Sequence, residues 1–252
     1  MKIFGVQIPM MTSLLLWGAL WEMVGQLELT MLLPPLSSIL FKMIEIVPTA
    51  PFLSAAMETG RAFLVGTGGA IVIGVPVGVV MGKSLLLDRL LLPWVNIFLC
   101  APLTALVPVL MILFGLGETT VVITTALFAI WIIVLDARAG VKSITPSLVE
   151  MARVYGANPW QAFMKIYIWA ALPEILAGIR LGVIRAVKGV IIGQLLISIV
   201  GFGRLFELYS SNFLMEYLWA LLLILFFFAF ALAEVLSALE RRVAYYAASR
   251  MQ

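Results

Sequence analysis

Six stretches of this chain are each long and apolar enough to cross a lipid bilayer as a helix. They cover residues 9–27, 62–82, 90–114, 119–136, 170–200 and 217–237. A membrane-spanning helix needs about 20 mostly apolar residues, because its backbone polar groups find no water inside the hydrocarbon. The composition agrees, since 63% of the residues are hydrophobic and 12% are charged, against roughly a quarter charged in soluble domains. We therefore expect an all-α integral membrane protein with six transmembrane helices.

The sequence offers few groups for catalysis, metal binding or nucleotide binding. It has no histidine, one cysteine and two aspartates, namely Cys100, Asp88 and Asp136, so we expect neither an enzyme nor a metal site. Residues 78–84 resemble a phosphate-binding loop, but that loop needs four residues between its glycines and this chain has three. We also expect no cofactor bound by this chain and no nucleic-acid partner.

The distribution of lysine and arginine predicts how the chain is oriented in the membrane. If the N-terminus is cytoplasmic, the outer side carries only Lys42, Arg61 and Arg204. The inner side then carries ten basic residues: Lys2, Lys83, Arg89, Arg138, Lys142, Arg153, Lys165, Arg241, Arg242 and Arg250. Because basic residues accumulate on the cytoplasmic side of membrane proteins, we expect both termini in the cytoplasm.

Small residues and prolines predict where the helices approach one another and where they break. A ridge at four-residue spacing in the second span predicts close contact with a neighbouring helix; it consists of Ala70, Gly74, Gly78 and Gly82. Pro102 and Pro108 remove two backbone amides from the third span and predict a disrupted helix there. A short amphipathic helix over residues 38–47 is expected on the outer membrane surface.

A hydrophilic stretch, residues 145–169, separates the fourth and fifth spans and begins with helix-start signals. Thr145 followed by Pro146 is a cap with proline at the first helical position, and Ser147 with Glu150 is a capping-box alternative. One apolar stripe follows at helical spacing; its members are Leu148, Met151, Ala152 and Tyr155. The pattern predicts a short amphipathic helix outside the membrane.

A second helix start follows directly. Gly156 suits the left-handed position that ends the first helix. Asn158, with Pro159 at the next position and Gln161 three residues after the cap, begins another helix. The sequence therefore predicts two short helices that meet at a glycine elbow. The alternative is an ordinary amphipathic connector lying on the membrane.

These segments resemble the transmembrane permease subunit of binding-protein-dependent ABC importers. The signature of that family is Glu-Ala-Ala, three residues, Gly, then nine residues before an apolar-x-Leu-Pro ending; this chain has residues 150–152, Gly156 and Ile166 in those places. Other segments are similar to the nitrate, sulfonate and taurine branch, namely residues 74–78, 108, 114–118, 139–143 and 172–180. Departures are Met151 in place of the middle alanine, residues 168–169 in place of the first Leu-Pro, and Gln194 where an acidic residue is common.

The resemblance implies a type I ABC importer permease fold, with residues 1–252 forming one transmembrane domain in the bacterial cytoplasmic membrane. It implies that residues 145–169 contain a cytoplasmic coupling helix that docks on an ATPase through Glu150, Met151, Ala152, Arg153, Tyr155, Gly156, Ala157 and Asn158. Its implied partners are a second copy of the chain, two ABC ATPase subunits that hold ATP and Mg²⁺, a periplasmic or lipid-anchored solute-binding protein, and membrane lipid.

Charges inside the fifth span are candidates for the solute path. Arg185 and Lys188 lie three residues apart, so they share one helix face, and charges at membrane depth need partners or water. They fit either an anion path or structural ion pairs with Glu22 or Glu234. The candidate path residues are Arg185, Lys188, Gln194, Thr104 and Asn96.

Two of these interpretations leave an alternative open. Gln194 could instead hold two helices together, and Arg180 could pair with Glu174 or Asp136 or reach toward the cytoplasmic surface. The expected solute is a small organic or inorganic anion such as a sulfonate, a nitrate-like ion or an aromatic acid. A neutral pyrimidine-like solute or vitamin precursor is the alternative, and a secondary transporter is a further one, although it would not need the elbow.

Overall fold

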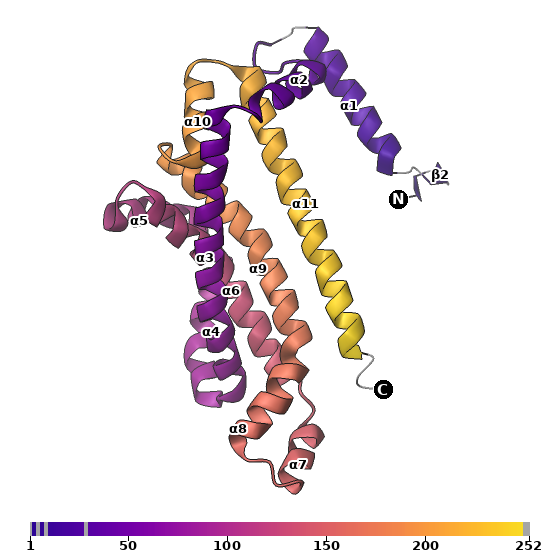
Figure 1. Cartoon of the computed structure of the whole chain (residues 1–252), viewed down its shortest axis with the longest axis vertical. Helices are drawn as coiled ribbons and strands as arrows, with labels where there is room; N and C mark the ends of the chain where they lie inside the picture. Colours follow the sequence, from indigo (N-terminus) through magenta and orange to yellow (C-terminus); the bar gives the residue numbers. More distant parts are fainter. Residues whose placement is uncertain (1, 4–5, 8–9, 28–29, 249–252) are drawn as a thin grey trace.

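The computed structural model describes residues 2–3, 6–7, 10–27 and 30–248, and almost all of them are helical. Two short strands, β1 (Lys2–Ile3) and β2 (Val6–Gln7), pair antiparallel. Figure 1 shows the helices arranged as an elongated bundle, with α2 and α10 at one end and α7 and α8 protruding at the other. The all-α expectation therefore holds for the body of the described chain.

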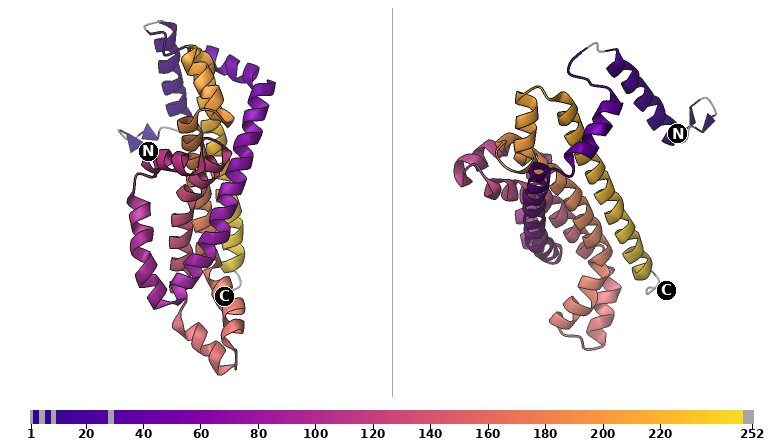
Figure 2. Two further views of the ribbon diagram at one scale, coloured as in Figure 1. Left: turned by 90° about the vertical axis from the view of Figure 1, so that its left-hand side faces the viewer. Right: turned by 45° about the horizontal axis from the view of Figure 1, so that its top comes forward.

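Four long helices build the bundle: α3 (Ala50–Lys83), α6 (Glu118–Lys142), α9 (Ile168–Ile197) and α11 (Met215–Ala248). The shorter helices are α1 (Met10–Gln26), α2 (Leu36–Ile46), α4 (Leu85–Cys100), α5 (Val107–Phe114), α7 (Pro146–Val154), α8 (Pro159–Ala162) and α10 (Gly201–Ser211). A 3₁₀ turn, η1 (Leu103–Leu106), precedes α5, and a π-helical turn, η2 (Phe163–Tyr167), joins α8 to α9. Figure 2 shows that α1 diverges from the bundle.

The number of spans differs from the six that the sequence predicts. Within the described residues, α3, α6 and the Met215–Ala238 part of α11 are each long and apolar enough to cross a membrane. Two bent pairs raise this number to five if each pair is one span: α4 with η1 and α5, and the helix from α8 through α9 with α10. Helix α1 has 17 residues, slightly fewer than the roughly 20 that a span needs. Pro9, the first residue of the predicted first span, lies outside the described part.

The predicted third span, residues 90–114, is not a single helix. Helix α4 ends at Cys100, Ala101 is extended, and the chain turns by 95° into η1 and α5. The cause is Pro102, because proline lacks an amide hydrogen and disfavours helical geometry in the residue before it. Pro108 does not break α5, since it lies in the first turn, where the backbone amides have no hydrogen-bond acceptor within the helix.

The predicted small-residue ridge of α3 is confirmed as a contact with α6. A Cβ atom on Gly78 would lie 2.4 Å from the carbonyl oxygen of Val134, and one on Gly82 would lie 2.6 Å from the Cβ of Val141. On its other side α6 meets α9 equally closely, since a Cβ on Gly182 would lie 2.5 Å from the Ile133 side chain. Helix α6 is thus held between α3 and α9 at backbone contact distance.

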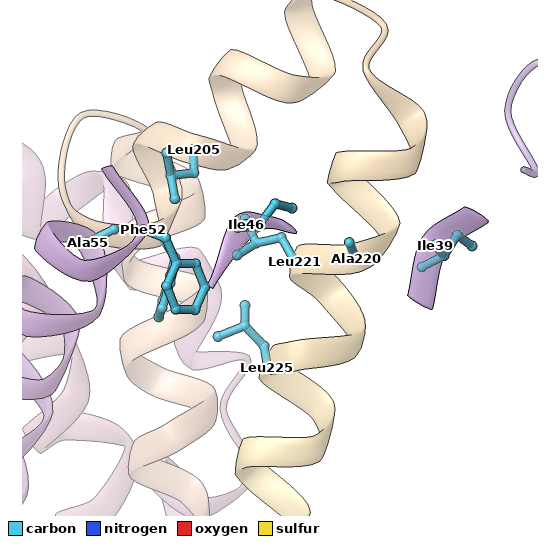
Figure 3. Close-up of a cluster of buried hydrophobic side chains, with 9 residues drawn as sticks. Ile39, Ile46, Phe52, Ala55, Leu205, Ala220, Leu221 and Leu225 are labelled. Carbon is cyan, nitrogen blue, oxygen red and sulfur yellow. The ribbon is translucent and has the colours of Figure 1, made fainter. Parts of the chain in front are cut away.

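The largest buried apolar cluster lies at the α2 and α10 end of the bundle. Figure 3 shows its side chains converging from α2, α3, α10 and α11; they are Ile39, Ile46, Phe52, Ala55, Phe202, Leu205, Ala220, Leu221 and Leu225. The helix predicted over residues 38–47 is confirmed as α2, which buries Ile39 and Ile46 and leaves Phe41 and Ile44 exposed. Its position on the membrane surface stays a prediction.

A polar cluster ties α2 to α11 beside these apolar contacts. The Lys42 ammonium donates to Glu45 over 2.8 Å and to the Tyr217 hydroxyl over 3.1 Å, and that hydroxyl donates to Glu45 over 2.8 Å. The hydrogen bond from Lys42 holds the pKa of Glu45 below its usual value, and the same bond raises the pKa of Lys42. Both groups therefore remain charged at neutral pH, and the cluster is an ionic link.

Candidate functional site

The first helix of the elbow, α7, begins as one of the two predicted alternatives. Thr145 occupies the cap position with extended backbone angles, and Pro146 is the first helical residue. The Thr145 hydroxyl makes no capping hydrogen bond, so the helix start depends on the fixed φ angle of proline. The alternative start at Ser147 is not used.

Helix α7 ends at a tightly bonded glycine turn. Gly156 has a φ of +77°, which confirms the predicted left-handed position. The amide of Gly156 donates to the carbonyl of Arg153 over 3.0 Å, and the amide of Ala157 donates to the carbonyl of Ala152 over 2.9 Å. This pair of bonds is a Schellman motif, which fixes the direction in which the chain leaves the helix.

The predicted cap of the second helix at Asn158 is confirmed and forms a capping box with Gln161, but the helix is longer than expected. The Asn158 side chain accepts from the Gln161 amide over 2.8 Å, and the Gln161 side chain accepts from the Asn158 amide over 3.0 Å. Helix α8 then continues through η2 into α9 without a break. No proline lies between Pro159 and Pro173, so no missing amide interrupts the helix there.

The elbow exposes apolar side chains although it is the hydrophilic part of the sequence. Val154 and Tyr155 are each 85% exposed, and Met151 and Trp160 are also exposed. The predicted stripe therefore does not pack against the rest of the chain as a unit; of its members Ala152 is buried. Exposed apolar residues rimmed by charged ones mark surfaces that bind another protein or a membrane.

Charged residues and a concave surface lie beside these apolar side chains. Glu150 and Arg153 are exposed on α7. An open hollow of about 380 Å³ lies at the glycine turn and along α8 and η2. Its lining residues are Tyr155, Gly156, Ala157, Gln161, Ala162, Lys165 and Ile166. The predicted coupling residues thus lie together on one projecting element with a fixed turn at its centre.

The predicted path residues lie on three different elements and differ in exposure. Asn96 on α4 and Thr104 on η1 are exposed, whereas Arg185 on α9 is half-buried and Lys188 is exposed. Within the described part of the chain, no hydrogen bond or ion pair joins any two of the five. The spacing of Arg185 and Lys188 places them on one helix face, but it does not specify how that face is oriented toward α4 and η1.

Gln194 is buried between helices. It is 1% exposed, and its side-chain oxygen accepts from the Thr59 hydroxyl over 3.0 Å and from the Phe202 amide over 3.2 Å. It also borders a cavity of about 70 Å³ together with Glu58 and Glu118. These bonds connect α9 to α3 and α10.

The ion pairs suggested for Arg185 and Lys188 do not form. The Glu22 carboxylate instead accepts from the amide and the hydroxyl of Ser37, over 2.9 and 2.7 Å, at the α1–α2 junction. Among the described residues, neither cation forms an ion pair with Glu22 or Glu234. Arg185 interacts electrostatically with Asp136 on α6, an acid that the sequence analysis considered only for Arg180.

A charge cluster that the sequence analysis did not single out lies near the elbow. Asp88 on α4, which is 5% exposed, accepts hydrogen bonds from both Arg138 and Lys142 on α6. The second Arg138 bond, from Nη2 to Oδ2, measures 3.1 Å. A signal was present, because Arg138 and Lys142 are four residues apart and share a helix face, but nothing indicated which acid lies opposite.

Comparison with known proteins shows that this chain is similar to transport permeases. Residues 71–245 match the family described as "Binding-protein-dependent transport system inner membrane component". The taurine transport system permease protein of Escherichia coli K12 is 28% identical over 230 residues, which cover 88% of this chain and 84% of that protein. The riboflavin transport system permease protein of Chloroflexus aurantiacus is 31% identical over 127 residues, 50% of this chain.

Two further similarities concern a betaine permease and a solved structure. The glycine betaine/proline betaine permease protein of Escherichia coli K12 is 31% identical over 153 residues. The chain spans 47% of the riboflavin protein and 43% of the betaine protein. A chain of the inward-facing MetNI methionine ABC transporter superimposes with a TM-score of 0.65 at 21% identity, over 77% of this chain and 99% of that one. At this identity the likeness shows a shared fold.

Proposed function

The chain belongs to the family of binding-protein-dependent transport system inner membrane components, and from this premise we propose that a cytoplasmic ATPase drives solute import through its elbow, residues 145–169. The family is one of transport permease subunits and not of catalytic enzymes. The observation that carries the proposal is the exposed apolar surface at the end of α7, where Val154 and the cap residue Tyr155 are each 85% exposed on a projecting turn.

The rigidity of the elbow suits it to transmitting force. The Schellman motif at Gly156 and the capping box at Asn158 fix both arms of the turn by backbone and side-chain hydrogen bonds. Helix α6 leads into the elbow, and α8 leads out of it into α9 without a break. A subunit that grips α7 and moves would therefore displace α6 and α9 together.

The proposed assembly contains two copies of this chain, two ATPase subunits that hold ATP and Mg²⁺, and a solute-binding protein on the outer side. In the membrane α1 would act as the sixth span, since its 17 residues extend over about 25 Å at 1.5 Å per residue. Both termini and the elbow would face the cytoplasm, as the basic residues favour. Arg250 and the last residues lie outside the described part.

A small organic anion or zwitterion is the solute class we favour. Half-buried Arg185 and exposed Lys188 place two cations on α9, at a depth where a charge without a partner or water is costly. The taurine permease relative, which matches most of this chain, bears the name of a sulfonate. Arg185, Lys188, Gln194, Thr104 and Asn96 remain the proposed path residues.

Introducing a charge into the exposed apolar surface of the elbow tests the coupling role. We expect Val154→Asp to remove the ATPase that co-purifies with the wild-type chain, because a carboxylate in a desolvated interface is left unpaired. The matched control is Ser211→Asp, which adds the same charge to an exposed position at the opposite end of the bundle. Equal ATPase recovery with both variants, measured by affinity purification from membranes, would contradict the proposal.

Neutralising the two cations of α9 tests the path. We expect Lys188→Gln to slow uptake of radiolabelled taurine into proteoliposomes and Lys188→Arg to preserve it, since only the charge would draw the anion. For Arg185→Gln, a structural pair predicts loss of assembled complex that Asp136→Asn restores. Equal uptake by Lys188→Gln and wild type would remove Lys188 from the path, and no uptake by wild type would exclude taurine as the solute.

A further inference from the structure

A short connection between α3 and α4 lies next to the end of α6, which precedes the elbow, and next to η2, which follows α8. The two helices are separated only by Ser84, whose amide donates to the carbonyl of Val80 over 2.9 Å. Its hydroxyl caps α4 by accepting from the Leu87 amide over 3.4 Å. We name residues 83–88 the α3–α4 turn. Because both of its ends are hydrogen-bonded, the turn is a stiff corner.

The α3–α4 turn is bound to the C-terminal end of α6, the helix that precedes the elbow. Asp88 is an almost buried carboxylate that accepts from Arg138 and Lys142 in the last turns of α6. Helix α7 begins four residues after Lys142, at Pro146. Without the carboxylate, two cations at i and i+4 would repel each other. Asp88 thus fixes the start of α4 to the end of α6.

The α3–α4 turn also contacts η2, the segment between α8 and α9. The Lys83 ammonium lies 5.1 Å from the centre of the Phe163 ring and 5.5 Å from that of Tyr167. Both rings belong to η2, the π-helical turn between α8 and α9. π-Helical turns are rare, and those that occur often lie at functional sites. The Lys83 ammonium over the two rings favours one arrangement of Phe163 and Tyr167.

Helix α4 has few other attachments. Among its 16 residues only Asp88 and Val95 are buried. Val95 packs with Met81 and Val134, and Phe98 stacks on Trp131 of α6 with ring centres 4.2 Å apart. Beyond Cys100 the chain turns by 95° into η1 and α5. The placement of this α4–α5 arm therefore depends mainly on α6 and on the α3–α4 turn.

We infer that the α3–α4 turn is a second transmission element, which carries displacement of the elbow into the α4–α5 arm. Asp88 acts as the main positioning residue, because its hydrogen bonds make α4 move with the end of α6. Lys83 adds a contact with η2, so the turn also moves with the segment that leads into α9. The inference rests on the proposed coupling function, but it concerns a different contact and a different moving part. When the elbow shifts, α4 and α5 move with α6.

Cys100 provides a native probe for this movement, because it is the only cysteine of the chain, is exposed, and lies at the end of α4. The assembled complex is reconstituted in vesicles, and the rate of Cys100 alkylation by a maleimide is measured without nucleotide and with ATP and vanadate. The labelled chain is separated from its partners by electrophoresis. We expect the rate to change on trapping in the wild type.

The variants separate transmission from folding. We expect Asp88→Asn to lose the nucleotide-dependent change, Asp88→Glu to keep it, and the matched control Arg89→Gln to keep it, since Arg89 is an exposed charge of α4 without an ion pair among the described residues. Lys83→Gln should reduce the change and Lys83→Arg should preserve it, because arginine also stacks on aromatic rings.

The outcomes are decisive in either direction. An unchanged wild-type rate on trapping, or a full change in Asp88→Asn, would overturn the inference. If Asp88→Asn does not assemble, the Lys83 pair decides: equal changes in Lys83→Gln and Lys83→Arg would overturn it, and loss in the glutamine variant alone would support it. Failure of the wild type to bind an ATPase at all would instead contradict the proposed function.

Discussion

Replacing Gly156 with valine is expected to abolish ATPase coupling while leaving the membrane helices folded. Gly156 has a φ of +77°, and a Cβ atom there would meet nothing within 4 Å, so the effect is one of backbone conformation and not of collision. A residue with a side chain pays about 1–2 kcal/mol in the left-handed region, and a β-branched one more. That energy lowers the population of the native elbow by a factor of roughly 5–30.

The measurements for Gly156 are the amount of co-purified ATPase and the ATP hydrolysis of the reconstituted complex. The control is Gly156→Asn, because asparagine tolerates the left-handed conformation far better than valine does. We expect the asparagine variant to stay close to wild type. If the valine variant binds and activates the ATPase as well as the asparagine variant does, the fixed turn is not required for coupling.

Replacing Gly78 with alanine is expected to destabilise the whole bundle. The added Cβ would lie 2.4 Å from the carbonyl oxygen of Val134 and 2.7 Å from the Cβ of Ala137. These are atoms of the α6 backbone and of a Cβ, so no side chain can rotate away and the two helices must separate. Overpacking of this kind costs about 1–3 kcal/mol or more. The midpoint of thermal unfolding in detergent should fall by several degrees.

Gly69→Ala is the matched control for this prediction. It makes the same chemical change in the same helix, but its Cβ would meet nothing within 4 Å. Alanine favours a helix over glycine by roughly 0.5–1 kcal/mol, so Gly69→Ala should be neutral or stabilising. Equal thermal midpoints for the two variants would show that α3 and α6 are not in backbone contact in the folded protein.

Local signals in the sequence were sufficient for the elbow. The left-handed position of Gly156 and the capping box of Asn158 and Gln161 depend on residues within a few positions of one another. The continuation of α8 into α9 was not predicted, although the sequence has no proline between Pro159 and Pro173 that would break the helix. The exposure of Val154 could not be predicted, because an amphipathic pattern does not show which face finds a partner.

The partners that charged residues find on other helices were not predicted correctly from the sequence. The sequence identified Arg185 and Lys188 as charges that need an explanation and suggested Glu22 and Glu234 as their partners. Among the described residues neither of these acids forms an ion pair with them, and Glu22 instead accepts hydrogen bonds from Ser37. The cluster around Asp88 was missed. A pair across two helices depends on how far each helix is rotated about its axis and shifted along it, and spacing along one helix does not contain that information.

By itself, therefore, the sequence determined the membrane class, the helical content, the cap chemistry of the elbow and the ridge of α3, because each depends on composition or on neighbours within one or two turns. The break after Cys100 was also predictable from Pro102, but its angle of 95°, the contact of Asp88 with α6 and the placement of Lys83 over η2 were decided only by the tertiary structure. These features are set by how α3, α4, α6 and α9 pack as a group, since a shift of one helix by a single residue would replace every cross-helix partner.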